Sequence, residues 1–275
     1  MRRRIQIPVL RDADAGDILR QHGVSARMLS ELKKLPDGIL LDYAPCRSID
    51  RAVVGQTLTI TFPHETNPAH CSDRKVPVLY EDEDYIVYDK PPFMPVHRSA
   101  GHGNDTLENI SPADCGFHVI NRLDRDTSGI CLVAKHSFAV TRADKVYTAL
   151  CCGSIDRPMR IDMPIAREEG SLMRRTVSED GQRAVTFVTP VMQAGGYTFV
   201  SVSLLTGRTH QIRVHMSAVG HPLAGDTMYG GDTSMPRHAL HCSELSFTHR
   251  VTGKRIRITS GLPDDFIKID NITAP

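Results

Sequence analysis

Two long strand-like runs joined by a tight turn constrain the fold of this chain most. They span 184–193 and 197–205 and flank Ala194-Gly195-Gly196, a pattern that predicts a β-hairpin. Alternate residues of the second run share one face: Thr198, Val200, Val202 and Leu204. A second hairpin is predicted at Thr252-Gly253, and a helix from near Thr209 to Gly220. Hairpins mixed with few helices favour an α+β fold, with a mixed, mostly antiparallel central sheet flanked by helices.

Chain size and composition limit the class of protein. The 275 residues suffice for one large domain and a small one, and 40% of them are hydrophobic. No apolar run of about 18 residues predicts a membrane-spanning helix. The basic start Met1-Arg2-Arg3-Arg4 precedes a polar segment and not the apolar core of a secretory signal, so we expect a cytoplasmic protein. The seven cysteines include no Cys-x-x-Cys pair, which favours free thiols over structural zinc.

A polar stretch near residue 64 divides the chain. We expect residues 1–63 to form a small N-terminal domain. Residues 64–76 are expected to form a linker, because they are polar and lack periodicity. Residues 77–266 are expected to form one strand-rich domain, followed by a C-terminal tail over 267–275. The elements expected in the small domain are helices over 14–22 and 25–35, the second capped by Ser25, and strands over 38–42 and 57–62.

The first segment that can carry chemistry spans 118–135. Its charged loop holds Arg122, Asp124, Arg125 and Asp126 between two apolar runs. A loop set between two core strands aims a carboxylate rigidly. A salt-bridged turn with no catalytic role is the alternative on these residues alone.

The second segment spans 205–226 and contains the predicted helix. Ile212, Met216 and Val219 would face the core, whereas the polar residues on another face are His210, Arg213 and Ser217. A guanidinium beside an apolar stripe is costly unless it is paired, so a carboxylate from another segment is the expected partner of Arg213. An exposed Arg213 is the alternative.

Together these segments resemble the RluA family of pseudouridine synthases. The resemblance rests on Arg122-Leu-Asp-Arg-Asp-Thr-Ser-Gly129, on Gly207-Arg-Thr-His-Gln-Ile-Arg-Val-His215 and on its continuation Gly220-His-Pro-Leu-Ala-Gly-Asp226. Val78-Leu-Tyr-Glu-Asp-Glu-Asp84 with Lys90-Pro91 is similar to the start of the family's catalytic domain. The motifs follow the family's order and cover about 77–260. They imply the pseudouridine synthase fold and an RNA-modifying isomerase.

The resemblance also implies roles for individual residues. Asp124 would be the catalytic aspartate, Arg213 its ion-pair partner and Tyr147 the residue that stacks on the target base. Arg122 would help to fill the space left by the flipped base, and Leu223 would line the pocket.

Other residues are assigned more weakly. Arg208 and His210 are further candidates for substrate binding, and residues 1–63 resemble a degenerate α-L RNA-binding module. Two positions depart from the family pattern: Asn121 stands where many members have histidine, and Phe93 where glycine is usual.

The implied reaction explains these residue types. Breaking the N1–C1′ bond of uridine and joining C5 to C1′ needs a carboxylate that acts on the sugar, as nucleophile or as base. A nearby arginine favours its ionised form, and excluding water prevents hydrolysis of the intermediate. The reaction needs no redox step, so we expect no cofactor and no metal. His210 and His215 lie five apart on the predicted helix, which does not suit a shared metal site.

A uridine in structured RNA must flip out of its stack to react, and basic residues can hold the phosphates. The net charge is only +1, but the segment from 206 to 260 contains seven Lys or Arg residues and only three acidic ones. The candidate phosphate contacts are Arg208, Arg237, Arg250, Lys254, Arg255 and Arg257. The expected substrate is ribosomal or transfer RNA, and a monomer is expected. The alternatives are an RNA-binding or assembly factor with the same fold and no activity, and a glycoside hydrolase.

Overall fold

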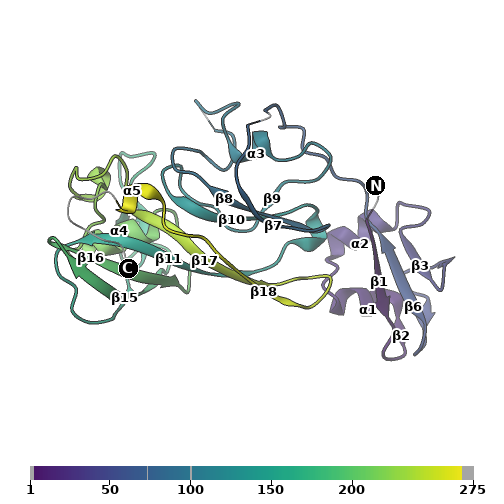
Figure 1. The fold of residues 1–275 in the computed structure, drawn as a ribbon. Helices are drawn as coiled ribbons and strands as arrows, with labels where there is room; N and C mark the ends of the chain where they lie inside the picture. Colours follow the sequence, from purple (N-terminus) through teal and green to yellow (C-terminus); the bar gives the residue numbers. More distant parts are fainter. Residues whose placement is uncertain (1–2, 73, 100, 268–275) are drawn as a thin grey trace.

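The computed structural model describes residues 3–72, 74–99 and 101–267, so the predicted tail lies outside the described residues after Ile267. The molecule is elongated, with the N-terminal domain at one end (Figure 1). None of the helices in the described ranges is long and apolar enough to cross a membrane. The seven cysteines are free thiols, and Cys131, Cys151 and Cys242 are buried.

A four-stranded antiparallel sheet, in the order β1-β6-β3-β4, forms the N-terminal domain. Its elements are β1 (Arg4–Pro8), β2 (Ala13–Asp14), α1 (Ala15–Gln21), α2 (Ala26–Leu32), β3 (Ile39–Leu41), β4 (Ala44–Pro45), β5 (Arg51–Ala52) and β6 (Thr57–Thr61). Ser25 caps α2 as predicted, because its Oγ accepts a hydrogen bond from the Met28 N–H at 3.2 Å. The helix ends before the predicted Leu35, since Pro36 disfavours helical backbone at the residue before it.

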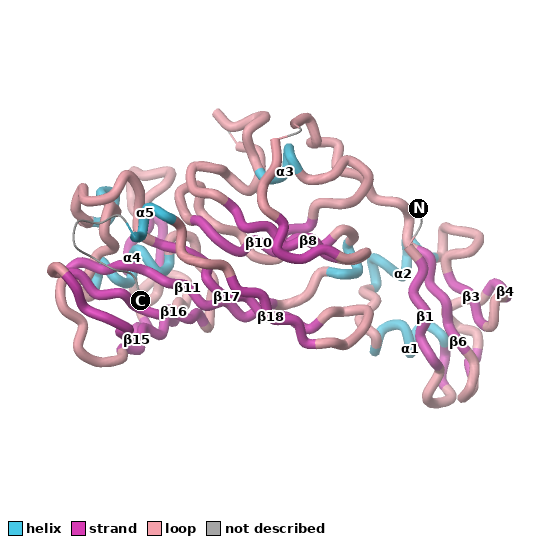
Figure 2. Tube along the Cα trace, in the orientation of Figure 1, coloured by secondary structure: helices cyan, strands magenta, loops and turns pink. Residues whose placement is uncertain are grey.

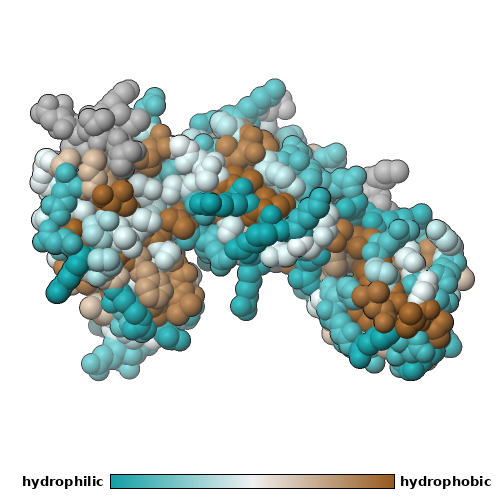
Figure 3. All heavy atoms as spheres, turned by 60° about the horizontal axis from the view of Figure 1, so that its bottom comes forward, coloured by the Kyte–Doolittle hydropathy of each residue, from teal (hydrophilic) through white to brown (hydrophobic). Residues whose placement is uncertain are grey.

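The N-terminal domain has its own core and a defined contact with the rest of the chain. Leu19, Leu32, Leu58 and Ile60 are fully buried in it, each contributing about 1.5–3 kcal/mol by burial. Phe138 of the larger domain completes this core, with its ring centroid 5.0 Å from that of Phe62. Seen from below, this domain is a separate lobe with apolar side chains on its surface (Figure 3). Its exposed apolar side chains include Leu10, Tyr43, Ile49 and Val54.

The described residues of the predicted linker, 64–72 and 74–76, form no helix or strand, and they pack against the larger domain. Asn67 Nδ2 donates to the carbonyls of Glu108, at 2.7 Å, and Ser111, at 3.1 Å. In the opposite direction, Asn109 Nδ2 of the larger domain donates a hydrogen bond of 2.8 Å to the Ala69 carbonyl. The segment is therefore fixed in place on the surface of its neighbour.

The larger domain is a mixed, mostly antiparallel sheet, visible as the magenta strands in Figure 2, with short helices beside it. Its main order is β12-β15-β16-β11-β17-β10-β8-β7, with β18 beside β17 and β9 beside β10. The strands are β7 (Val78–Glu81), β8 (Tyr85–Lys90), β9 (His118–Val119), β10 (Ser128–Ala134), β11 (Ala143–Cys152), β12 (Met159–Asp162), β13 (Ile165–Arg167), β14 (Arg175–Val177), β15 (Val185–Ala194), β16 (Tyr197–Leu204), β17 (Leu240–Thr248) and β18 (Arg255–Thr259). The helices are α3 (Leu107–Ile110), α4 (Gln211–Ala218), α5 (Asp264–Ile267) and short 3-10 turns at Ser137–Ala139 and Thr227–Tyr229.

Both predicted hairpins are present. β15 and β16 pair across Gly195 and Gly196, whose φ angles of 59° and 84° are those of a type I′ turn. β17 and β18 pair across Gly253, at φ 71°. This second hairpin extends toward the N-terminal domain (Figure 1), where Arg250 Nη2 donates to the Gly23 carbonyl at 2.7 Å.

Helix α4 is shorter at its start than the sequence predicts. It begins at Gln211 because His210 adopts left-handed backbone, with φ 57°. Ile212 and Met216 are buried, as the apolar stripe predicts, and Gly220 follows the helix at φ 83°. The early start was wrong, but the core-facing side of the helix was correctly identified.

Candidate active site

The loop 121–127 lies at the one parallel junction among the described strand pairs, where β10 meets β17. Gly129, at φ 104°, allows the two strands to approach, because a Cβ there would lie 2.4 Å from the Cys242 carbonyl oxygen. Leu123 is buried, and the Thr127 N–H closes a turn onto the Asp124 carbonyl at 3.1 Å. The loop thus leaves Asp124 partly exposed, with 29% of its side-chain surface accessible.

A cavity opens in front of this loop. Its lining residues are Arg122, Leu123, Asp124, Thr127, Tyr147, Leu204, Arg208, His210, Gln211, Ile212, Arg213 and Leu240. Six of the seven site residues taken from the sequence are therefore together here, and Asp124 is the one carboxylate in this described lining.

Leu223 does not line the cavity. Its side chain is fully buried in the core, and its backbone forms a bridge to Cys151 of β11. The apolar wall is supplied instead by Leu123, Leu204 and Leu240.

Asp124 and Arg213 meet across 89 positions of sequence. Arg213 Nη1 lies 3.4 Å from Asp124 Oδ2, and only 7% of the arginine side chain is exposed. The expected proximity is present, although 3.4 Å is long for a charge-assisted hydrogen bond. The guanidinium is therefore a close counter-ion, and its strongest bonds go to another group.

That group is Asp226, the last residue of the motif 220–226, which had no predicted role. Arg213 Nε and Nη2 bind its two carboxylate oxygens at 2.7 Å and 2.8 Å, and its side chain is fully buried. Burial lowers the pKa of Arg213, but Asp226 and Asp124 together raise it, so the pKa lies above its usual value. The signal that could have identified Asp226 was the need of a mid-helix arginine for a buried acid.

Tyr229 is a second residue that sequence reasoning missed. Its ring centroid lies 4.9 Å from the Arg213 guanidinium carbon, and its hydroxyl accepts the Arg175 N–H at 2.9 Å. The hydroxyl lies 2.8 Å from His210 Nδ1, and we infer that its proton is donated to that nitrogen, because the Arg175 N–H already occupies one of its acceptor sites. On that assignment neutral His210 carries its ring proton on Nε2, which lies 3.8 Å from Asp124 Oδ2.

His210 is uncharged near neutral pH. Burial lowers its pKa below 6.5, and nearby Arg213 acts in the same direction, whereas Asp124 opposes both. The positive charge beside Asp124 is therefore supplied by Arg213.

Tyr147 lines the cavity from β11. The pairing of β11 with β17 shifts register between Val146 and Tyr147, a β-bulge of the kind that re-aims a side chain near a site. Only 6% of Tyr147 is exposed. Burial raises its pKa well above 10, so the phenol stays protonated at neutral pH.

The candidate phosphate contacts divide into three groups. Arg208 and Lys254 are exposed, and Arg208 also lines the cavity. Arg255 and Arg257 are exposed but paired with Asp144 and Glu244.

Arg237 and Arg250 form the third group, and the guanidinium groups of both bond within the protein. Arg237 is almost fully buried, at 3% exposure, and binds the far side of the loop 121–127. Arg250 is half-buried and stacks over Phe138 at 5.1 Å, where it joins the two domains.

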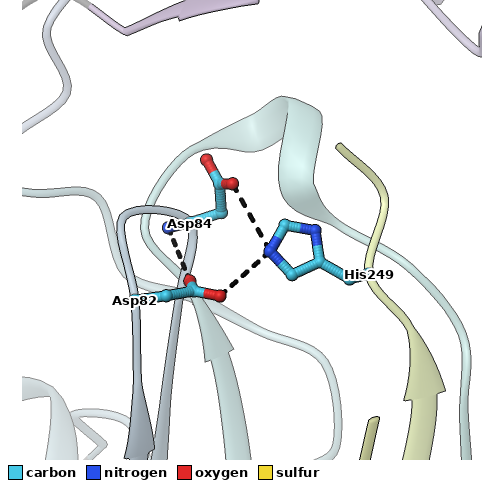
Figure 4. Close-up of side chains that lie close together, drawn as sticks. All are labelled: Asp82, Asp84 and His249. Atoms are coloured by element: carbon cyan, nitrogen blue, oxygen red, sulfur yellow. Dashed lines mark hydrogen bonds and ion pairs between the residues drawn. The ribbon is translucent and has the colours of Figure 1, made fainter. Parts of the chain in front are cut away.

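One described cluster has the spacing of a metal site, at the junction of the two domains (Figure 4). His249 Nε2 lies 2.9 Å from Asp82 Oδ2 and 3.5 Å from Asp84 Oδ2. Asp84 also accepts two bonds from Arg3, at 2.8 Å and 3.0 Å, and one from His136 at 2.9 Å. These partners already occupy the carboxylates, so the cluster is a hydrogen-bonded network that ties Arg3, just before β1, to the larger domain.

Comparison with known proteins identifies related RNA pseudouridine synthases. The family described as RNA pseudouridylate synthase matches residues 84–218. The chain is 37% identical to the uncharacterized RNA pseudouridine synthase YjbO of Bacillus subtilis, over 90% of this chain and 94% of that protein. It is 35% identical to ribosomal large subunit pseudouridine synthase D of Pseudomonas aeruginosa, over 93% and 89%. The solved human RNA Pseudouridylate Synthase Domain Containing 1 is similar at a TM-score of 0.57 and 25% identity, over 70% of this chain and 85% of that one.

Proposed function

From the premise that this chain belongs to the RNA pseudouridylate synthase family, as an enzyme that isomerises uridine to pseudouridine in RNA, we propose that Asp124 is its catalytic carboxylate. The observation that carries the proposal is the position of this carboxylate. It is the one acid in the described lining of the cavity, partly exposed there, with the Arg213 guanidinium at 3.4 Å.

The reaction sets what Asp124 must do. The N1–C1′ bond breaks, the uracil turns, C5 bonds to C1′, the C5 proton leaves to solvent and N1 gains a proton. Asp124 acts on the sugar, by adding to C1′ or by removing a proton, and both routes need the ionised carboxylate. Arg213 supplies a permanent positive charge beside that carboxylate, and Asp226 holds the guanidinium in place.

The other lining residues would bind and orient the nucleotide. Tyr147 would offer its flat, uncharged ring to the detached uracil. Arg122 is exposed at the mouth of the cavity, where it can fill the gap that a flipped base leaves. Arg208 would contact phosphate, and neutral His210 would donate its Nε2 proton toward Asp124 or the substrate.

The substrate is proposed from the relatives. Several are named for the large ribosomal subunit, so we favour large-subunit ribosomal RNA over transfer RNA. The N-terminal domain would contribute RNA binding. A monomer working in the cytoplasm remains a prediction. Mapping pseudouridines in both RNA classes, from cells with and without the gene, identifies the target: a site lost only from transfer RNA would contradict our preference.

Tritium release from RNA labelled at uridine C5 tests the role of Asp124. Wild type should release tritium and form pseudouridine, and Asp124→Asn should release none. Asp126→Asn is the matched control, because this neighbouring carboxylate pairs with Arg125 and does not line the cavity. Release by Asp124→Asn at the wild-type rate would overturn the proposal.

The same assay separates the alternatives. RNA binding without any release by wild type would indicate an inactive binding or assembly factor. Free uracil with abasic RNA would indicate a glycoside hydrolase.

A further inference from the structure

A second buried arginine lies behind the loop that carries Asp124. The Arg237 side chain has no exposed surface, and its Nη1 donates to the Asp126 carbonyl at 3.0 Å. Its Nη2 donates to Ser128 Oγ at 3.2 Å, and Nη1 also reaches the Leu240 carbonyl at 3.2 Å. One guanidinium thus joins the end of the loop, the start of β10 and the start of β17.

The neighbouring residue holds the same loop. His238 Nε2 lies 2.8 Å from Thr127 Oγ1, and Thr127 closes the turn onto the Asp124 carbonyl. The pair 237–238 therefore binds three successive residues on the C-terminal side of Asp124, namely the carbonyl of Asp126 and the side-chain hydroxyls of Thr127 and Ser128. A rigid support of this kind decides where a carboxylate points.

Arg237 is itself held by the short C-terminal helix α5. Its Nε and Nη2 bind the two oxygens of Asp265 at 2.6 Å and 2.8 Å. The Phe266 ring, which is fully buried, lies 5.3 Å from the guanidinium carbon. A planar guanidinium fixed at two nitrogens by a carboxylate has its remaining N–H groups fixed as well.

We propose that Arg237 and Asp265 are a positioning pair that sets the geometry of the loop carrying Asp124, so that helix α5 is part of the active-site architecture. The proposal rests on the proposed function of Asp124. Neither residue lines the cavity, so the pair acts through the loop backbone and not on the RNA. Because catalysis depends on near-attack geometry, a displacement of about 1 Å can lower a rate by about 100-fold.

The test is a single-turnover assay with enzyme in excess over RNA labelled with tritium at uridine C5. For Asp265→Asn we expect the rate constant to fall about 10- to 100-fold, with full reaction amplitude and a Kd for RNA within about twofold of wild type. The matched control is Asp264→Asn, an exposed neighbour on the same helix, which should behave as wild type. A purely structural role would instead lower the amplitude, through loss of folded enzyme, and leave the rate constant unchanged.

A conservative variant keeps the proposal open to refutation if Asp265→Asn folds poorly. Asp265→Glu retains the carboxylate and should recover most of the rate constant. A wild-type rate constant in Asp265→Asn, or a loss confined to amplitude in either variant, would overturn the positioning role. Failure of the proposed function is distinct, since it would appear as an inactive wild type or a fully active Asp124→Asn.

Discussion

The loop 121–127 has a buried arginine–aspartate pair on each side. The pair on the cavity side, the front, and the pair on the α5 side, the back, have the same geometry but different roles. On the front, Arg213 holds Asp226 with Nε and Nη2, and its Nη1 reaches the Asp124 carboxylate. On the back, Arg237 holds Asp265 with the same two nitrogens, and its Nη1 reaches the Asp126 carbonyl. Arg213 places a positive charge beside the reacting group, whereas Arg237 holds the loop through the Asp126 carbonyl and the Ser128 hydroxyl and does not contact the reacting carboxylate. What a buried arginine does is therefore set by what its free nitrogen contacts.

The two pairs also differ in exposure. Only 1% of the Asp226 side chain is accessible, compared with 28% for Asp265. Breaking a sealed ion pair leaves an uncompensated charge and costs about 3–5 kcal/mol, whereas water can solvate a partly exposed partner. We therefore expect front-side changes to cost more in both stability and rate.

Among changes to these two ion pairs, the largest effect should follow Arg213→Lys. Lysine keeps the charge but cannot hold two oxygens of Asp226 and still reach Asp124. Removing a preorganised electrostatic group of this kind lowers rates by about 10²–10³-fold, and we expect a loss in that range in the single-turnover rate constant. A loss below threefold would show that the front arginine is not the counter-ion of Asp124.

Asp226→Asn should come next. The amide keeps the shape but loses the charged bonds to Arg213, each worth about 1.5–3 kcal/mol, so we expect the rate constant to fall at least tenfold. Glu244→Gln is the control, because it breaks an exposed pair with Arg257. If both changes lowered the rate constant equally, the buried pair would matter no more to catalysis than the exposed pair, which would contradict the account.

Tyr229→Phe should have a smaller effect that depends on pH. Without the hydroxyl, the neutral form of His210 loses the proton donor to its Nδ1, so its pKa should rise from its lowered value. Protonated His210 would then compete for Asp124. We expect about a fivefold loss of rate below pH 6.5 and little above it, measured as a shift of the acid limb of the pH–rate profile to higher pH. An unchanged profile would contradict the inferred proton position.

The junction between the domains should affect stability and leave the rate almost unchanged. Burial raises the pKa of Asp84 and of Glu65, but hydrogen bonds from His136 and Arg3 to Asp84, and from His118 and the Ser137 N–H to Glu65, lower each to about 2. Both carboxyls therefore stabilise the fold above about pH 4, and this contribution is lost as the pH falls toward 2.

Thermal unfolding measured from pH 7 to pH 3 should show that loss, and Asp84→Asn should flatten it while keeping the rate constant at pH 7 within twofold. A rate constant that fell as far as in Asp226→Asn would mean that the loop is not supported locally.

How far the sequence predicts this molecule depends on whether a residue's neighbours can be inferred. The hairpins at Gly195-Gly196 and Gly253 follow from local turn chemistry, and Asp124, Tyr147 and Arg213 follow from motifs. Burial is a property of the whole fold, so Arg237 could not be told from a surface arginine.

The remaining differences have the same origin. Leu223 was placed at the cavity although its side chain lies in the core, and His210 was placed in the helix although its backbone is left-handed. Asp226 had no role because its partner is chosen by packing of α4 against the loop that follows it.

The most direct test of the central claim is a crystal structure of the Asp124→Asn variant bound to an RNA that the wild type modifies. We predict a flipped uridine in the cavity, with its C1′ about 3–3.5 Å from the side chain at position 124 and its base against the Tyr147 ring. A target uridine bound elsewhere, or a sugar facing away from position 124, would contradict the account.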